Sequence, residues 1–317
     1  MLFALVAATC ASLALGAVSI PLSEVIDTIF GRQVPEATEK IIEILRLPRT
    51  VEAIVVGAAL GVAGACLQGA LNNPLASPDV IGVTGGAGFG AMLVIVLFPG
   101  SIAMLPISAL FFGLFAAAMV FIIGFTGRGG GNITRVILGG IAVASLFSAG
   151  TAAIMAAYPD RVPNGIYFLV GGLTTSGWDT LETVWPYLAV GFILAAFMIR
   201  PLDRLMLGDD VASSLGSRPR LIRFTAALAA AVLASAAASI AGLLAFLGLV
   251  IPHLIRLLGG TKSHVFVMPV SALAGAALLT AGDTLARTIA APEEMPVGPF
   301  LVLLGVPLFL WLLRKAA

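Results

Sequence analysis

The segment from Leu45 to Leu75 places the strongest constraint on the fold of this chain. It reads LRLPRT, then a long run of apolar or small residues, then LQGALNNPLA. A helix needs roughly 20 predominantly apolar residues to cross the hydrocarbon core of a bilayer. The segment therefore predicts a membrane-spanning helix, with two arginines at one end and an Asn-Asn-Pro turn at the other.

The composition extends this prediction to the whole chain. Of the 317 residues, 60% are hydrophobic and 10% are charged, and the mean hydropathy is +1.10. Soluble domains carry about 25% charged residues, so this much apolar surface needs lipid as its solvent. In lipid only helices or closed barrels satisfy the backbone, and long unbroken apolar runs are unlike barrel strands, which alternate over about 10 residues. We predict an all-α polytopic membrane protein with a single domain, residues 1–317.

Apolar segments separated by turns predict ten transmembrane helices. They cover about residues 1–20, 50–70, 81–98, 103–125, 133–157, 184–200, 221–240, 242–258, 265–285 and 297–313. The boundary near Gly242 has no charged loop, so one long bent helix is the alternative for the seventh and eighth segments. Residues 158–183 are rich in glycine and aromatic side chains and suit a short helix at the membrane interface.

When these ten segments cross a membrane in turn, the basic residues are distributed unequally between its two sides. Eleven of the 17 lie on the side that holds the C-terminus, and six lie on the other side. Cytoplasmic loops are enriched in Lys and Arg, so we predict that both termini face the cytoplasm and that the chain lies in the cell inner (plasma) membrane. The longest outer loop is then 21–49, and the longest inner loop is 201–220. No basic stretch precedes the first segment, so we expect no cleaved signal peptide.

Motifs for catalysis and for nucleotide hydrolysis are missing. The sequence has no GxSxG and no HExxH. The stretch GGTKS at 259–263 is not a P-loop, because a P-loop needs Gly directly before its Lys, and Thr261 stands there. We therefore predict that the chain is not an enzyme and does not itself hydrolyse ATP.

Ionisable residues are nearly absent from the predicted spans. Glu52 and Asp283 lie near the predicted outer edge, where pairing with Arg49 and Arg287 respectively explains them. Ion-coupled carriers place such groups deep within their spans. The sequence thus favours a passive pore or a permease driven by a separate motor chain.

The candidate metal ligands are few. Cys10 and Cys66 both fall in predicted spans and indicate neither a disulfide nor a metal site. His253 follows Pro252 in GLVIPHLIRLL, where it is interpreted as a hydrogen-bonding residue at a proline bend, with a metal or haem ligand as the alternative. We predict no metal site.

The inner loop contains a short helical pattern. Asp209 and Asp210 stand near its start, where acids suit the helix dipole, and Gly216 suits its end. This helix is interpreted either as a solvated connector or as a docking helix for a cytoplasmic partner.

Six ordered motifs make the chain resemble the FecCD-type iron-chelate and cobalamin permease family of ABC importers. They are LRLPRT, LQGALNNPLASPDVIGVTGGAG, LGDDVASSLG, FLGLVIPHLIRLL, GDTLAR followed by EMPVG, and LGVPLFLWLL. The resemblance implies a homodimer with a central translocation path, a cytoplasmic ATPase dimer and a substrate-binding protein outside. It implies no cofactor on this chain, since ATP and Mg belong to the ATPase, and we expect no nucleic-acid partner.

The resemblance also assigns roles to individual residues. Arg46, Arg49 and Arg287 match arginines that meet acidic residues of the binding protein, and an exposed arginine can fork to a carboxylate. Asn73, Leu75 and Thr134 match cytoplasmic gates. Leu207, Gly208, Asp209, Asp210, Leu215 and Gly216 match a coupling helix that fits a groove on the ATPase.

The implied mechanism is ATP-driven alternating access, in which nucleotide binding shifts two permease chains between outward and inward states. The implied substrate is an iron chelate, either haem or a ferric siderophore, with cobalamin and then molybdate as alternatives. The outer segment YFLVGGLTTSGW departs from the WLxGSL form of siderophore permeases, and this departure does not identify a ligand. The alternative functions, from other classes of protein, are a passive multi-span channel and a membrane scaffold protein.

Overall fold

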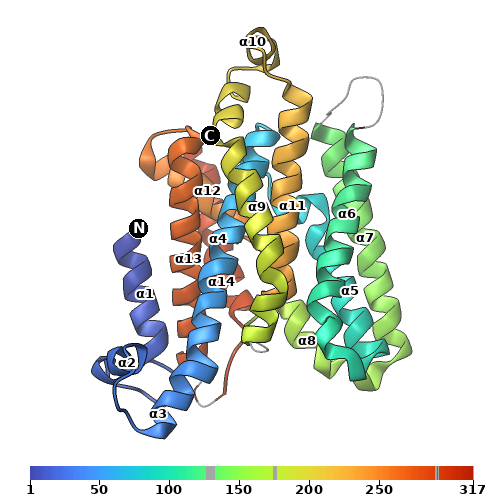
Figure 1. Cartoon of the computed structure of the whole chain (residues 1–317). Coiled ribbons are helices and arrows are strands. Elements are labelled where there is room, and N and C mark those ends of the chain that lie inside the picture. Colours follow the sequence, from blue (N-terminus) through green and yellow to red (C-terminus); the bar gives the residue numbers. More distant parts are fainter. Residues whose placement is uncertain (126–132, 174–176, 290, 292, 317) are drawn as a thin grey trace.

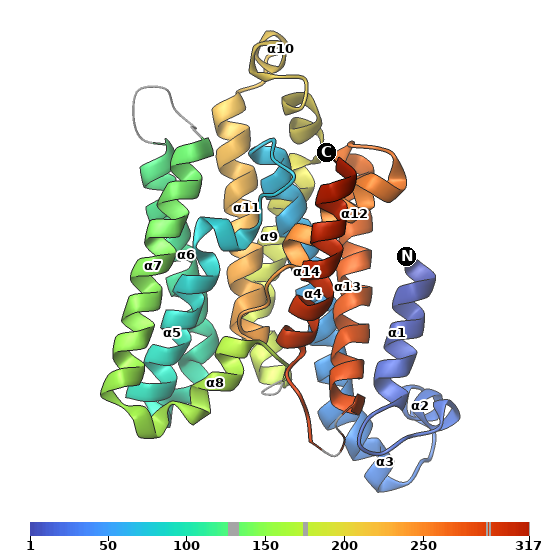
Figure 2. The ribbon, with the colours of Figure 1, turned by 180° about the vertical axis from the view of Figure 1, so that it is seen from behind.

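A computed structural model describes residues 1–125, 133–173, 177–289, 291 and 293–316 of the chain. Every regular element in these ranges is helical, and the long helices run side by side in one bundle (Figures 1 and 2). The helix α10 (Asp209–Ser214) projects at one end of the bundle, which we call the α10 end. The helices α2 (Leu22–Ile29) and α3 (Glu36–Lys40) lie at the other, the α2–α3 end.

The remaining elements follow the predicted order. They are α1 (Leu2–Ala14), η1 (Ile41–Arg46), α4 (Leu47–Ala70), η2 (Pro78–Ile81), α5 (Val83–Leu97), η3 (Pro99–Met104), α6 (Leu105–Phe125), α7 (Ile133–Ala157), η4 (Pro159–Arg161), α8 (Pro163–Val170), α9 (Trp178–Leu205), α11 (Pro219–Ala241), α12 (Leu247–Gly259), α13 (His264–Ile289) and α14 (Val297–Ala316). The short helix α8 falls within the segment 158–183, as the sequence suggests.

Six helices within the described residues are long and apolar enough to cross a membrane. They are Glu36–Ala70, Pro99–Gly124, Thr134–Ala157, Trp178–Leu205, Pro219–Ala241 and His264–Ile289. Shorter apolar helices occupy Leu2–Ala14, Val83–Leu97, Leu247–Gly259 and Val297–Leu308. The all-α membrane fold is confirmed. A count of ten crossings stays a prediction, because the four shorter helices do not reach the length that assigns a membrane crossing.

The predicted outer loop 21–49 contains helices. It contains α2, and the helix that starts at Glu36 continues through η1 into α4 without a break. Pro48 lies within this continuous helix, near the start of α4. Just before it, η1 is a π-helical turn, a local adjustment found inside longer helices. These helices were not predicted from the sequence.

The helix α4 forms the centre of the bundle and packs backbone to backbone against its neighbours. A Cβ placed on Gly57 would lie 2.3 Å from the carbonyl oxygen of Gly275 in α13. A Cβ on Gly64 would lie 1.8 Å from the carbonyl oxygen of Gly248 in α12. Small residues at such spacing let helices approach closely. The glycine pattern of this segment therefore serves packing within one chain.

Substituting Gly64 by Ala is expected to destabilise the protein by about 1–3 kcal/mol, because the added methyl group overpacks the α4–α12 contact. Gly100→Ala is the matched control, since a Cβ at Gly100 meets nothing within 4 Å. Denaturant unfolding in detergent measures both variants. A Gly64→Ala protein as stable as the control would show that α4 and α12 can separate without cost.

The predicted boundary near Gly242 is confirmed, and the single bent helix is excluded. The helix α11 ends at Ala241, and Gly242 has a φ of +66°, which glycine adopts without strain. The backbone then runs without helix until Leu247, where α12 begins. Leu243 N donates to the carbonyl oxygen of Phe168 at 3.2 Å, so this stretch is bonded to α8.

The connection between α4 and α5 enters the bundle. Its helical turn η2 packs against α7, and a Cβ on Gly140 of α7 would lie 1.7 Å from the carbonyl oxygen of Val80. Figure 2 shows this segment part-way along the bundle, beside α6 and α11. Asp79 is thereby placed beside the middle of α7.

Candidate functional site

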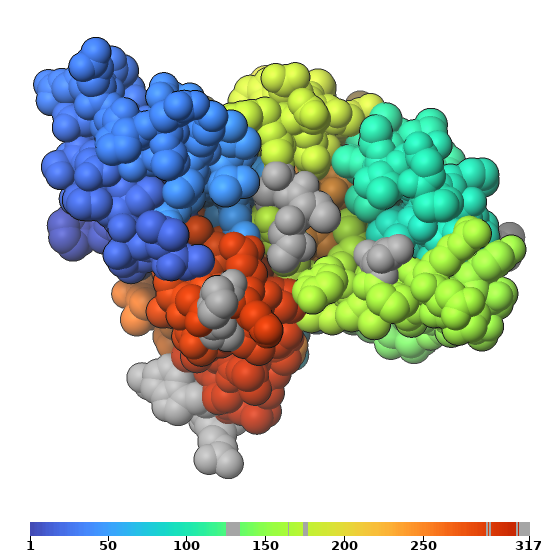
Figure 3. Space-filling model, turned by 90° about the horizontal axis from the view of Figure 1, so that it is seen from below, coloured from blue at the N-terminus to red at the C-terminus, as the bar shows by residue number. Residues whose placement is uncertain are grey.

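The three predicted docking arginines line one pocket at the α2–α3 end. Arg46 ends η1, Arg49 lies in the first turn of α4, and Arg287 lies in the last turn of α13. The pocket has a volume of about 180 Å³, and Glu294 also lines it. Figure 3 looks onto this end, where the N-terminal segment (blue) lies against the C-terminal part (orange to red). Distant parts of the sequence therefore build this arginine pocket together.

Arg46 binds the end of α1. Its Nη1 donates to the carbonyl oxygens of Leu13 at 2.7 Å and Ala14 at 3.0 Å, and its Nη2 donates to the carbonyl oxygen of Val18. The last carbonyls of a helix lack partners within the helix and favour a nearby cation. Arg46 thus satisfies acceptors of its own chain.

Arg49 and Arg287 share one buried carboxylate. Arg49 Nε and Nη2 each donate to Asp283 at 3.0 Å, and its Nη1 donates to Glu294. Arg287 Nε lies 3.2 Å from Asp283 Oδ2, and its Nη2 donates to Ser12 Oγ at 3.0 Å. Asp283 is only 1% exposed. The network therefore joins α1, α4 and α13 through charges that water barely reaches.

This network corrects two expectations. The arginines are not exposed, since Arg46, Arg49 and Arg287 are 5%, 8% and 5% exposed. Glu52 is also bonded differently from the prediction, because its Oε1 accepts from the backbone N–H of Gly177 at 3.2 Å. The guanidinium of Arg49 is already occupied by two other carboxylates. The predicted pairing of Asp283 with Arg287 is confirmed, whereas charge spacing along one helix could not reveal the partners of Arg49 and Glu52.

The predicted gate residues Asn73 and Leu75 lie in the turn that ends α4. Asn72 has a φ of +46°, a backbone conformation that Asn tolerates. The backbone N–H of Asn73 donates to the carbonyl oxygen of Gln68 at 3.1 Å, and its Oδ1 accepts from the N–H of Leu75 at 2.9 Å. The turn is fixed by its own hydrogen bonds, and Leu75 is left exposed.

Thr134, the third predicted gate residue, is exposed in the first turn of α7. The loop that precedes it, residues 126–132, lies outside the described residues. A gating role for Asn73, Leu75 and Thr134 stays a prediction.

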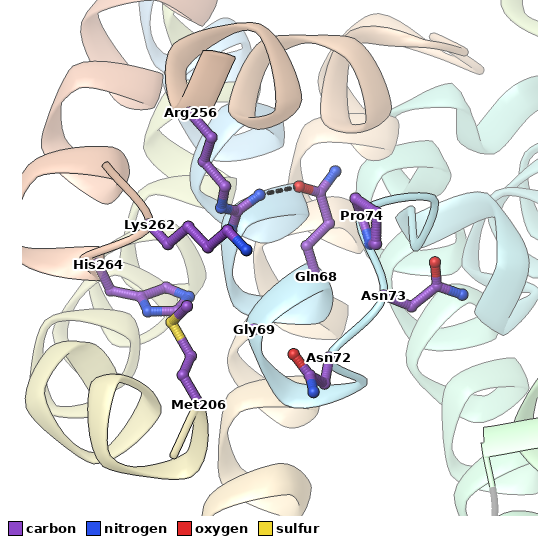
Figure 4. Close-up of a pocket in the computed structure, with 9 residues that line it drawn as sticks. All are labelled: Gln68, Gly69, Asn72, Asn73, Pro74, Met206, Arg256, Lys262 and His264. Atoms are coloured by element: carbon purple, nitrogen blue, oxygen red, sulfur yellow. Dashed lines mark hydrogen bonds between the residues drawn. The ribbon is translucent and has the colours of Figure 1, made fainter. Parts of the chain in front are cut away.

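A cavity of about 130 Å³ lies beside the turn that ends α4 (Figure 4). Its lining comprises Gln68, Gly69, Asn72, Asn73, Pro74, Met206, Arg256, Lys262 and His264. Gln68 Nε2 donates to the carbonyl oxygen of Leu249 at 3.0 Å, and its Oε1 accepts from Arg256 Nη1. Sequence reasoning missed both side chains. The available signals were one amide in the apolar run of α4 and one arginine in GLVIPHLIRLL.

The predicted coupling segment forms a short exposed helix, α10. Gly208 and Gly216 bracket it with φ values of +96° and +74°, which glycine adopts without strain. Leu207, Val211 and Leu215 are 57%, 48% and 57% exposed. Val211 lies within α10 and Leu215 directly follows it, whereas Leu207 precedes Gly208 and lies outside the helix. Exposed apolar side chains that project from the end of the bundle are typical of an interaction surface.

Arg223 of α11 connects α10 to the end of α4. Its Nη1 and Nη2 donate to the two carboxylate oxygens of Asp209 at 2.8 and 2.7 Å. Its Nε donates to the carbonyl oxygen of Ala70 at 3.2 Å. These hydrogen bonds lower the pKa of Asp209 below its ordinary value. Sequence reasoning missed Arg223, because its partners are distant in the chain.

The structure describes the candidate metal ligands as separate groups. His253 lies half-buried in α12, next to Pro252. Cys10 and Cys66 are free thiols. Within the described ranges, no group of three or more His, Cys, Asp or Glu side chains is placed to hold a metal ion.

Comparison with known proteins decides the family. The profile of the FecCD transport family matches residues 4–315. The chain belongs to the FecCD transport family. The resemblance stated from the sequence is therefore confirmed, and the expectation of a transport protein rather than an enzyme is confirmed with it.

Individual relatives and one solved structure agree with this FecCD assignment. The chain is 39% identical over 305 residues to the iron(3+)-hydroxamate import system permease protein FhuB of Bacillus subtilis, which covers 96% of this chain and 79% of that protein. It is 37% identical over 277 residues to the hemin transport system permease protein HmuU of Yersinia pestis, with 86% and 82% covered. A metal-chelate-type ABC transporter solved in an inward-facing conformation matches with a TM-score of 0.86 and 31% identity, over 99% of this chain and 97% of that chain.

Proposed function

We propose that this FecCD chain is the permease subunit of a binding-protein-dependent ABC importer that carries an iron chelate across the plasma membrane. The observation that carries the proposal is the family match over residues 4–315, supported by the structural match to a metal-chelate-type transporter. The two named relatives are permeases of import systems, one for iron(3+)-hydroxamate and one for hemin. The cargo is then a ferric siderophore or haem, with cobalamin as the alternative.

The energy for transport comes from an ATPase that docks on α10. The exposed side chains of Leu207, Val211 and Leu215 provide an apolar contact at the α10 end. The bonds from Arg223 to Asp209 and to the carbonyl oxygen of Ala70 make a polar connection from that contact to the end of α4. A displacement of α10 by the ATPase would therefore pull on the turn that holds the predicted gate residues. Differential nucleotide affinity for two states supplies the driving force for alternating access.

The translocation path runs between two copies of the chain, along α7. This helix is mostly exposed in a single copy. A groove of about 490 Å³ beside it is lined by Asp79, Ser145 and Ser148 among apolar residues. Polar and ionisable side chains at membrane depth face a bundle interior or a water-filled cavity rather than lipid. This polar groove supports a path that a second copy of the chain closes.

The substrate-binding protein docks at the α2–α3 end. The arginine pocket holds three guanidinium groups and is lined by one partly exposed carboxylate, that of Glu294. Since the side chain of Glu294 is 47% exposed and bonds to Arg49, an acidic residue of the binding protein can replace it. The pocket is therefore proposed as a preformed carboxylate site that Glu294 fills in the undocked state.

Substituting Glu294 by Gln is expected to tighten capture of the binding protein by about tenfold, because it removes the resident competitor for Arg49, and charge-assisted hydrogen bonds are worth about 1.5–3 kcal/mol. Surface plasmon resonance on the reconstituted permease measures the affinity. Glu293→Gln removes the same charge from an exposed neighbour and serves as the control. Equal affinities for both variants would place the docking contact away from the arginine pocket.

The importer proposal is tested by adding the partners in turn. The permease should copurify with an ATPase from its own cell, and the loaded binding protein should raise the turnover of that ATPase. A passive channel would conduct the chelate with neither partner present. Conduction of the chelate without the ATPase and the binding protein would contradict the proposal. So would an ATPase turnover that does not change when the loaded binding protein is added.

A further inference from the structure

Four large apolar side chains are exposed together on the helix α2. Leu22, Ile26 and Ile29 belong to the helix, Phe30 directly follows it, and all four are between 44% and 73% exposed. The N–H of Phe30 donates to the carbonyl oxygen of Ile26 at 3.1 Å, so Phe30 continues the last turn. Residues three and four apart share one face of a helix, and these four therefore form one stripe, the α2 stripe. Scattered exposed apolar residues are ordinary, whereas a contiguous patch marks a site of interaction.

A second side of α2 is fixed to the rest of the chain. Val25 is buried and packs with Leu13 of α1, with Ile20 and with Ile42 of η1. Ile42 precedes Arg46 by about one helical turn, and Arg46 binds carbonyl oxygens at the end of α1. The helix α2 is therefore held at the level where α1 ends, and the α2 stripe does not arise from loose packing.

The third side of α2 is polar. It holds Ser23, Glu24 and Asp27. Glu24 accepts from Thr38 Oγ1 at 3.2 Å, and Asp27 accepts from Arg32 Nη1 at 2.9 Å. At 3.6 residues per turn, the centres of the three sides are about 120° apart around the helix. The helix thus presents one side to the protein, one to water and one, the α2 stripe, to an apolar medium.

The position of α2 excludes a second copy of the chain as the partner that covers the stripe. The helices α2 (blue) and α7 (green) lie at opposite edges of the bundle in both ribbon views (Figures 1 and 2). The proposed translocation path places the second copy along α7, so that copy leaves α2 uncovered. This step rests on the proposed path, whereas the existence of the α2 stripe does not.

Exposed apolar side chains also connect the α2 stripe to the surface of α1. Leu15 and Val18, in the connection between α1 and α2, are exposed, and so are Leu2, Phe3 and Val6 of α1. The helix α1 is itself apolar, and lipid tails are as apolar as the leucine side chains of such a helix. The α2 stripe therefore continues a surface that lipid solvates.

We propose that α2 is an interfacial helix that inserts the α2 stripe into the membrane leaflet at the α2–α3 end. Helices that lie in a membrane surface bury their apolar face about 5–10 Å into the boundary between headgroups and acyl chains. Many of them carry Lys and Arg that attract anionic lipids, whereas α2 carries Glu24 and Asp27 and no basic residue. Burial of apolar area alone then holds the helix, and zwitterionic lipid suffices. Through Val25 and Ile42, this anchor keeps the arginine pocket at the membrane surface.

Spin labelling of the full-length chain in phosphatidylcholine nanodiscs tests the insertion of α2. Cys10→Ala and Cys66→Ala remove the native thiols, and one label is attached at Ile26→Cys or, as the matched control, at Ser23→Cys on the polar side. Both positions are exposed, so the label fits either without displacing the core. Collision with oxygen reports lipid, and collision with a water-soluble nickel chelate reports water. We expect an oxygen-to-nickel ratio about tenfold higher at Ile26 than at Ser23, because only the α2 stripe reaches the acyl chains. Equal ratios would overturn the proposal.

A second position and a second lipid complete the test. Ile29→Cys lies on the same stripe and should give the same high ratio as Ile26→Cys. Low collision with both reagents at these two positions would mean that protein covers the stripe, which contradicts a lipid contact. Replacing part of the phosphatidylcholine by phosphatidylglycerol should leave the ratio unchanged, because α2 has no basic residue to attract the added charge. A high ratio that appears only with the anionic lipid would overturn the proposal of an anchor held by apolar burial alone.

Discussion

Replacing Asp283 by Asn is expected to lower the free energy of unfolding by about 3–5 kcal/mol, because removing one partner leaves buried charges uncompensated. Asp283 is 1% exposed and accepts from Arg49 twice at 3.0 Å, while Arg287 Nε lies 3.2 Å from it. An amide keeps the shape of the carboxylate but cannot neutralise two guanidinium groups. The remaining acid, Glu294, bonds to Arg49 and is half exposed.

The measurement is denaturant unfolding of the purified chain in detergent. Asp27→Asn is the matched control, since Asp27 pairs with Arg32 at 2.9 Å and their side chains are 35% and 70% exposed. An exposed pair contributes about 0–1 kcal/mol. Equal losses in the two variants would show that the network at the arginine pocket is no more important for stability than a surface pair.

Replacing Arg223 by Gln is expected to reduce the number of chelates transported per ATP by about tenfold, although the ATPase still binds. The substitution removes two charge-assisted hydrogen bonds to Asp209 and one to the carbonyl oxygen of Ala70, each worth about 1.5–3 kcal/mol before screening by solvent. The exposed apolar side chains at α10 are unchanged. Motion of α10 would then no longer reach the end of α4.

Uptake and ATP hydrolysis are measured together in proteoliposomes for this variant. Arg220→Gln removes an exposed cation from the same first turn of α11 and should leave the ratio unchanged. Since Arg223 lowers the pKa of Asp209, the pair is present at neutral pH and is lost only as pH falls through that lowered value. The coupling ratio should therefore be insensitive to mild acidification. An unchanged ratio in Arg223→Gln would remove this connection from the mechanism.

Most of the fold follows from local sequence patterns. The apolar runs predict the positions of α4, α7, α11 and α13, because a membrane helix must satisfy its own backbone within one continuous segment. The break at Gly242 is also predictable, since glycine is the residue that takes positive φ without strain. The helices within 21–49 are not predicted by these apolar runs.

The candidate site is predictable in its residues but not in its contacts. Arg46, Arg49 and Arg287 are found by motif, yet the burial of Arg46 and Arg49 depends on carbonyl groups of α1 and on Asp283, which lie far away in the sequence. Arg223 carries no motif at all. Its importance comes from which atoms it reaches, and such partners are fixed by tertiary packing.

The most direct test of the importer assignment is uptake of a ferric hydroxamate labelled with radioactive iron into proteoliposomes. The vesicles contain the permease and its ATPase with ATP on the side of α10, and the loaded binding protein is added on the side of the arginine pocket. We predict accumulation against a gradient that requires ATP and both partners. Flux that only runs down the gradient, or that persists without ATP, would contradict the account.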